Sequence, residues 1–195
     1  MKTSRTENKP YTTFAWVAGV YLAAVFMAVA YAWASRVHLF DLSLTVSLYV
    51  GLFRWTSTLY FFAAAVICVL LGQYVAKIRL RPIQKLLYGA ILLCVFGCAW
   101  FPCNGSRSEL VRDIHDGFSY VLVILVALSF ALMALLARNA LQRRFALGSL
   151  VFSVFFILAF ALKLSWFKDT IFIWENGIIV LLFLELLLEW QPSAE

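Results

Sequence analysis

Residues 118–137 read FSYVLVILVALSFALMALLA, twenty consecutive positions without a charged side chain. A hydrocarbon core about 30 Å thick is crossed by roughly 20 helical residues. Inside that core no water bonds to the peptide groups, so the segment must pair its own N–H and C=O groups as an α-helix. We therefore predict that this stretch spans a membrane.

Five further apolar runs of similar length flank this segment, and short polar connections separate them. They cover residues 14–34, 55–76, 83–101, 145–164 and 171–188. Arg81-Pro82 and Arg138-Asn139 fall at the boundaries of runs, where helices commonly stop or start. We predict an all-α fold, a single integral membrane domain over residues 1–195 that forms a polytopic transmembrane helical bundle of about six spans.

The composition points to the same solvent and limits the partners. Hydrophobic residues make up 64% and charged residues only 13% of the chain, against about half and a quarter in a usual soluble domain. The net charge of +6 comes from basic residues beside apolar runs, which favours lipid headgroups over nucleic acid. We expect membrane lipids as partners, a membrane protein as a further candidate, and neither nucleic acid nor a resident cofactor.

The basic residues also predict an orientation. Ten of the sixteen Lys and Arg residues lie in the amino-terminal segment and in the second and fourth connections, and six lie on the other side. Cytoplasmic loops carry the excess of positive charge, so we predict a multi-pass protein of the cell membrane with both termini in the cytoplasm. The stretch 41–50 lies on the outer side. Its apolar residues fit a strand or a helical face, and we favour a short interfacial helix because a lone strand would leave open edges.

The two histidines are the first candidates for chemistry. His38 and His115 both fall near the outer ends of predicted spans. With Cys103 or Asp116 nearby they can bind a divalent metal, and two imidazoles can also ligate a haem. The alternative is a helix start in which Asp113 is the N-cap and Asp116 stabilises the first turn.

Aromatic and polar residues of the outer connections form a second candidate site. Convergent polar groups between aromatic walls are typical of sites that bind a lipid or a small hydrophobic ligand. The candidate ligand-binding residues are Arg54, Arg112, Asp113, His115, Trp166, Trp174 and Glu175.

Charged residues inside the spans are a third place for function, because they are costly in lipid and usually face protein or water. Glu185 and Glu189 are four residues apart and share one helical face. Glu185 is a candidate proton relay or substrate-binding group, and the alternative is a structural pair with Arg138, Arg143 or Lys77. Glu175 and Lys163 lie at the outer ends of adjacent spans, where they can pair.

One segment carries a family resemblance. Phe101-Pro102-Cys103-Asn104 leaves the third run, and His115 precedes the fourth. This arrangement resembles a family of bacterial six-span membrane proteins, the domain of unknown function 998 family, which is distantly similar to the DRAM-like proteins. Asn104 stands where that family often has Asp. The resemblance implies a six-span fold and a membrane location, and it brings no activity.

Three classes of function remain open from the sequence. The first is a binding or accessory protein that holds a lipid or supports a membrane partner through the outer polar patch. The second is a membrane enzyme, or a metal- or haem-binding redox protein, that uses His115 with Asp113 and Asp116. The third is a small transporter or channel with Glu185 and Lys163 along its path.

Overall fold

The computed structural model describes residues 9–35, 41–101 and 108–189, and all regular elements in these ranges are helices. The long helices are α1 (Lys9–Ala34), α3 (Arg54–Lys77), α4 (Pro82–Trp100), α5 (Glu109–Leu136), α6 (Ala140–Ala161) and α8 (Ile171–Leu188). Two short helices, α2 (Val46–Gly51) and α7 (Ser165–Lys168), lie in the connections. All six long helices are long and apolar enough to cross a membrane, so the predicted all-α six-span bundle is confirmed.

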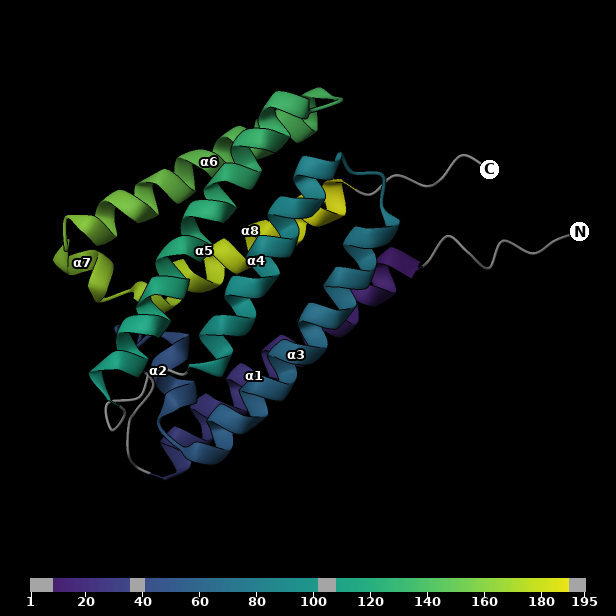
Figure 1. Cartoon of the computed structure of the whole chain (residues 1–195). Coiled ribbons are helices and arrows are strands. Elements are labelled where there is room, and N and C mark those ends of the chain that lie inside the picture. Colours follow the sequence, from purple (N-terminus) through teal and green to yellow (C-terminus); the bar gives the residue numbers. More distant parts are fainter. Residues whose placement is uncertain (1–8, 36–40, 102–107, 190–195) are drawn as a thin grey trace, which may run out of the picture.

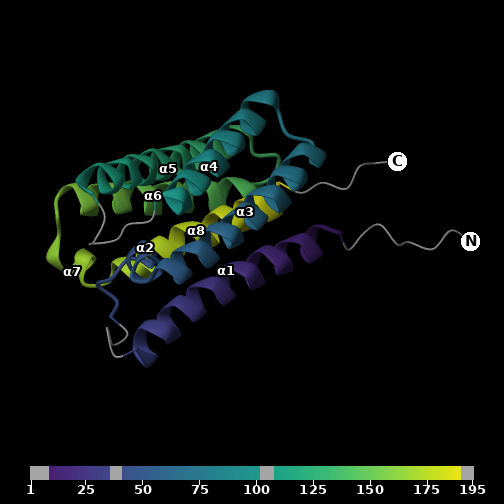
Figure 2. The same cartoon turned by 60° about the horizontal axis from the view of Figure 1, so that its bottom comes forward.

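Consecutive long helices pack side by side, and the last one returns to the middle of the bundle. Contacts join α1 with α3, α3 with α4, α4 with α5 and α5 with α6. Helix α8 lies between the α1–α3 pair and the group formed by α4, α5 and α6 (Figure 1, Figure 2). Inward-pointing polar side chains of α8 therefore reach residues of other helices, such as Tyr21 of α1 and Ser129 of α5.

The bundle has two chemically different ends. Helix α1 begins and α8 ends at the same end (Figure 2), as an even number of spans requires. We call this the basic end, because its connections and the helix ends next to them hold Lys77, Arg79, Arg81, Lys85, Arg138, Arg143 and Arg144. The opposite end holds α2 and α7, and we call it the α2 end.

The outer surface of the bundle is apolar. Leu135 is 82% exposed and Phe26 is 71% exposed, positions that water would penalise and lipid accommodates. Four partly or largely exposed tryptophans, Trp33, Trp55, Trp100 and Trp166, lie at or next to helix termini of the α2 end. Tryptophan is typical of the membrane–water interface, so these rings indicate where that interface meets the bundle.

Two local predictions have different outcomes. The predicted short helix is confirmed as α2, whose N-cap residue Thr45 accepts a hydrogen bond from Leu48 N at 3.1 Å. The predicted N-cap at Asp113 is wrong, because α5 begins at Glu109 with Ser108 in the N-cap position. No Pro or Gly interrupts residues 109–116, and Glu109 in the first turn complements the helix dipole, so the helix extends beyond its apolar run.

Helices α4 and α5 approach closely at Gly97. A β-carbon on Gly97 would lie 2.6 Å from the ring of Phe118. That ring stacks on Phe101, with centroids 6.1 Å apart and an interplanar angle of 12°. Small residues permit such close helix contacts in membranes, and Gly97 has this role between α4 and α5.

Candidate functional site

The aromatic candidates Trp166 and Trp174 lie together at the α2 end. Their ring centroids are 6.0 Å apart, and Phe155 stacks on Trp166 at 5.8 Å. Phe167 is fully buried beneath them and lies 5.7 Å from Trp174. The indole Nε1 of Trp174 donates to Thr170 Oγ1 at 3.1 Å. These rings join α6, α7 and α8, and they account for the ordered turn between the last two spans.

Glu175 holds α2 against α8. Its Oε2 accepts a hydrogen bond from Val46 N at 2.9 Å, and Val46 is the first residue of α2. The N-terminus of a helix attracts a carboxylate, because its first N–H groups lack partners within the helix. One residue further along α8, Asn176 accepts from the Tyr21 hydroxyl at 2.8 Å. The predicted pairing of Glu175 with Lys163 does not occur among the described ion pairs, and Lys163 lies two residues after the end of α6 with a φ of 53°.

The side chain of His115 forms hydrogen bonds to the carboxyl end of α4. Its Nδ1 lies 2.6 Å from the Phe101 carbonyl oxygen and 3.1 Å from that of Cys98. Carbonyl oxygens only accept, so Nδ1 is the donor in both contacts. The side chain is buried, and it bonds to carbonyl groups that the last turn of α4 leaves without helical partners.

The predicted metal ligands do not form a recognisable centre in the described part of the chain. His38 and Cys103 lie outside the described residues. Asp116 is half-buried in α5, one residue after His115. Within residues 9–35, 41–101 and 108–189, no three His, Cys, Asp or Glu side chains come together in a way that would hold a metal ion. Cys68, Cys94 and Cys98 have free thiols.

The remaining charged candidates have separate neighbourhoods. Arg112 pairs with Glu109 at 4.0 Å on the exposed first turns of α5, and Asp113 is exposed beside it. Arg54 begins α3 and is exposed. The described hydrogen bonds, ion pairs and ring contacts join Trp166 with Trp174, and they connect none of the other predicted ligand-binding residues to each other.

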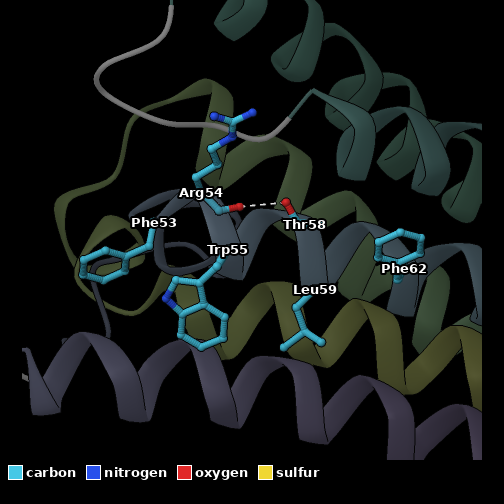
Figure 3. Close-up of a pocket in the computed structure, with 6 residues that line it drawn as sticks. All are labelled: Phe53, Arg54, Trp55, Thr58, Leu59 and Phe62. Carbon is cyan, nitrogen blue, oxygen red and sulfur yellow. Dashed lines mark hydrogen bonds between the residues drawn. The ribbon is translucent and has the colours of Figure 1, made fainter.

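Arg54 lines an open groove on the surface of α3. The lining residues are Phe53, Arg54, Trp55, Thr58, Leu59 and Phe62, and the lining is almost wholly apolar (Figure 3). The side chains of Trp55 and Leu59 project toward α1, while the Arg54 guanidinium projects away from it (Figure 3). Tyr31 of α1 packs edge-on against Phe53 and Trp55, with centroids 4.8 and 4.6 Å away. This contact fixes the wall of the groove next to α1.

A second polar cluster lies near the basic end, around the last turns of α8. Glu185 is fully buried there, and Ser129 Oγ of α5 lies 2.8 Å from its Oε2. Glu189 accepts a hydrogen bond from Gln84 Nε2 at 2.9 Å, and Gln142 Nε2 donates to the Leu188 carbonyl at 2.7 Å. Buried residues of three helices, α4, α5 and α6, thus surround the end of α8.

The predicted structural pair for Glu185 is wrong. No Lys, Arg or His of the described ranges forms an ion pair with it, and the electrostatic partner of Arg138 is Glu189 instead. The reason is that Glu185 lies one turn deeper in the bundle than Glu189, beyond the basic connections. Sequence reasoning missed Ser129, Tyr88, Gln84 and Gln142. The two glutamines carried a signal, since each is an uncharged polar residue in the first turn of a long helix, next to basic residues.

These features define the chain as a multi-pass α-helical membrane protein with a groove at the α2 end and a buried polar cluster near the basic end. Comparison with protein-family models, with curated proteins and with solved structures finds no match to the chain.

Proposed function

We propose that this protein binds an anionic phospholipid in the groove of α3, and that it acts as a lipid-binding or accessory protein in the membrane. The single observation that carries the proposal is a nearly apolar groove with one exposed cation at its rim, Arg54, whose guanidinium projects away from the side chains of Trp55 and Leu59 (Figure 3). A phospholipid has the same order of groups, with a charged phosphate next to apolar chains.

Each part of the groove suits one part of that lipid. The planar guanidinium of Arg54 matches two phosphate oxygens, and no ion pair in the described part of the chain occupies it. Phe62 lies eight residues further along α3, about 12 Å deeper along the helix axis, where an acyl chain would run. Trp55 is 40% exposed, and its amphipathic ring suits the headgroup level.

The proposal includes an orientation. We propose that the protein lies in the cell membrane with both termini in the cytoplasm, so that the groove opens in the outer leaflet. The concentration of Lys and Arg at the basic end supports this orientation through the positive-inside rule. The resemblance to the bacterial six-span family stays a prediction beside it.

The test compares two lipids and two arginines. Purified protein in detergent is titrated with phosphatidylglycerol or phosphatidylcholine, and bound lipid is counted by native mass spectrometry. We expect tighter binding of phosphatidylglycerol and a loss of about tenfold in Arg54→Gln, equivalent to about 1.4 kcal/mol. Arg112→Gln is the matched control, because Arg112 is also exposed at the α2 end but lies outside the groove.

Two outcomes would refute the proposal. One is an equal loss of phosphatidylglycerol binding in Arg54→Gln and Arg112→Gln, because the effect would then come from general surface charge. The other is unchanged lipid binding in Thr58→Trp, a substitution that fills the groove at an exposed position while leaving both arginines in place.

A further inference from the structure

Glu185 is the most unusual ionisable group of the described chain. It lies in the last third of α8 with no exposed surface. Its Oε1 is one of two buried side-chain polar atoms without a hydrogen-bond partner in the described residues, and the other is Ser149 Oγ on the adjacent helix α6. A buried carboxyl group in a transmembrane helix is expensive, so Glu185 is a candidate functional residue.

The hydrogen bonds around Glu185 can accommodate its protonated form. Ser129 Oγ lies 2.8 Å from Glu185 Oε2 and also 2.8 Å from the Val126 carbonyl oxygen. A serine hydroxyl has one hydrogen to donate, and the Val126 oxygen can only accept. Ser129 can donate to Val126 with an undivided hydrogen when Glu185 is protonated, because the Oε2–H of Glu185 then donates to Ser129 Oγ.

The ionised form has its own arrangement of the same atoms. When Glu185 loses its proton, the Ser129 hydroxyl can rotate and donate to Oε2 instead. The Val126 carbonyl then loses only this extra bond, because it lies inside α5 and keeps its position in the helix ladder. One hydroxyl rotation therefore accommodates either charge state, and no helix has to move.

A second carboxyl group lies between Glu185 and the basic end. Glu189 is one turn further along α8, on the same face and about 6 Å away along the axis. It is 6% exposed, it accepts from Gln84 at 2.9 Å, and Arg138 acts on it electrostatically. Two phenols also face these carboxyl groups: Tyr88 on α4 has a hydrogen-bond interaction with Glu185, and Tyr74 on α3 interacts electrostatically with Glu189.

We propose that Glu185 is a reversible proton-binding site, and that it exchanges its proton with the basic end of the bundle through Glu189. In the release step the O–H bond of Glu185 breaks and an O–H bond forms on the Glu189 carboxylate. Glu189 then passes the proton to water at the basic end, which restores its carboxylate. This site is separate from the lipid groove of α3, and it gives the protein a proton-dependent state inside the membrane.

Carbodiimide labelling tests the site on the unmodified protein. Dicyclohexylcarbodiimide reacts with protonated carboxyl groups in apolar surroundings, and peptide mass spectrometry locates the adduct. We expect labelling of Glu185 at low pH that falls about tenfold for each pH unit above the titration midpoint. Labelling that does not change with pH, or that occurs only on other carboxyl groups, would overturn the proposal. Protection by Na⁺ at constant pH would also overturn it, because the ligand would then be a metal cation.

Infrared difference spectroscopy provides the second measurement. The wild-type protein should show the carbonyl band of a protonated carboxyl group that disappears reversibly as the pH rises. Glu185→Gln should remove this band. Glu175→Gln changes the other glutamate of α8 and should leave the band in place. Ser129→Ala should shift the midpoint, whereas Ser153→Ala, which removes a buried hydroxyl that bonds within α6, should not. A band that persists in Glu185→Gln would assign the proton to another residue and refute the inference.

Discussion

Replacement of Gly97 by alanine should weaken the contact between α4 and α5. The new β-carbon would lie 2.6 to 2.7 Å from three atoms of the Phe118 ring, about 1 Å inside the usual contact distance of 3.5–4.0 Å between carbons. The ring cannot simply turn away, because it stacks on Phe101. Overpacking of this kind costs about 1–3 kcal/mol, which exceeds the gain of about 0.5–1 kcal/mol from replacing a helical glycine.

The comparison is made within one helix. A β-carbon on Gly89 of α4 would meet no heavy atom within 4 Å, so Gly89→Ala should leave stability unchanged or raise it. Thermal unfolding in detergent should rank Gly97→Ala below wild type and Gly89→Ala at or above it. Phe118→Leu should recover part of the loss in the double variant. If Gly97→Ala is as stable as Gly89→Ala, or if Phe118→Leu adds its own loss without any recovery, the proposed steric contact is wrong.

Two further predictions concern the carboxyl groups at the two ends of α8. Glu175→Ala should remove the bond to Val46 N, lower stability by about 1.5–3 kcal/mol and speed hydrogen exchange in α2, while Glu175→Gln, which keeps an acceptor oxygen, should lose much less. Burial raises the pKa of Glu189 above the usual glutamate value, and Arg138 and Gln84 only partly offset this shift. The stability that the Glu189 carboxyl group contributes is therefore fully present below the usual pKa of glutamate and is lost as the pH rises through the raised pKa. The melting temperature of the wild type should fall over that pH range. It should fall less in Glu189→Gln, which cannot ionise.

The span architecture was predictable because one physical requirement dominates it. A stretch such as residues 118–137 has no alternative to a helix in lipid, whatever its local propensities. Helix ends in the polar connections obey weaker rules. Residues 109–117 mix charged and apolar side chains, and the apolar run alone did not indicate that α5 begins at Glu109. Helix α7 has only four residues, too few for a periodic pattern.

Individual residues of the candidate sites could be predicted from the sequence, but most of their contacts with other residues could not. Glu185 stood out, since a carboxyl group inside an apolar run is rare. Its neighbours Ser129 and Tyr88 lie far away in the sequence, and only the position of α8 among the other helices brings them together. Arg54 was also singled out, but the groove beside it depends on how Tyr31 packs against Phe53 and Trp55.

The central position of α8 has a consequence for how the bundle is assembled during synthesis. The ribosome produces α8 after the other five long helices, yet α8 packs against α1, α5 and α6. When Glu175, Asn176 and Glu185 enter the bilayer, the residues that receive them, Val46, Tyr21 and Ser129, have already been made. The polar groups of the last span can therefore form their hydrogen bonds with helices that were synthesised before α8.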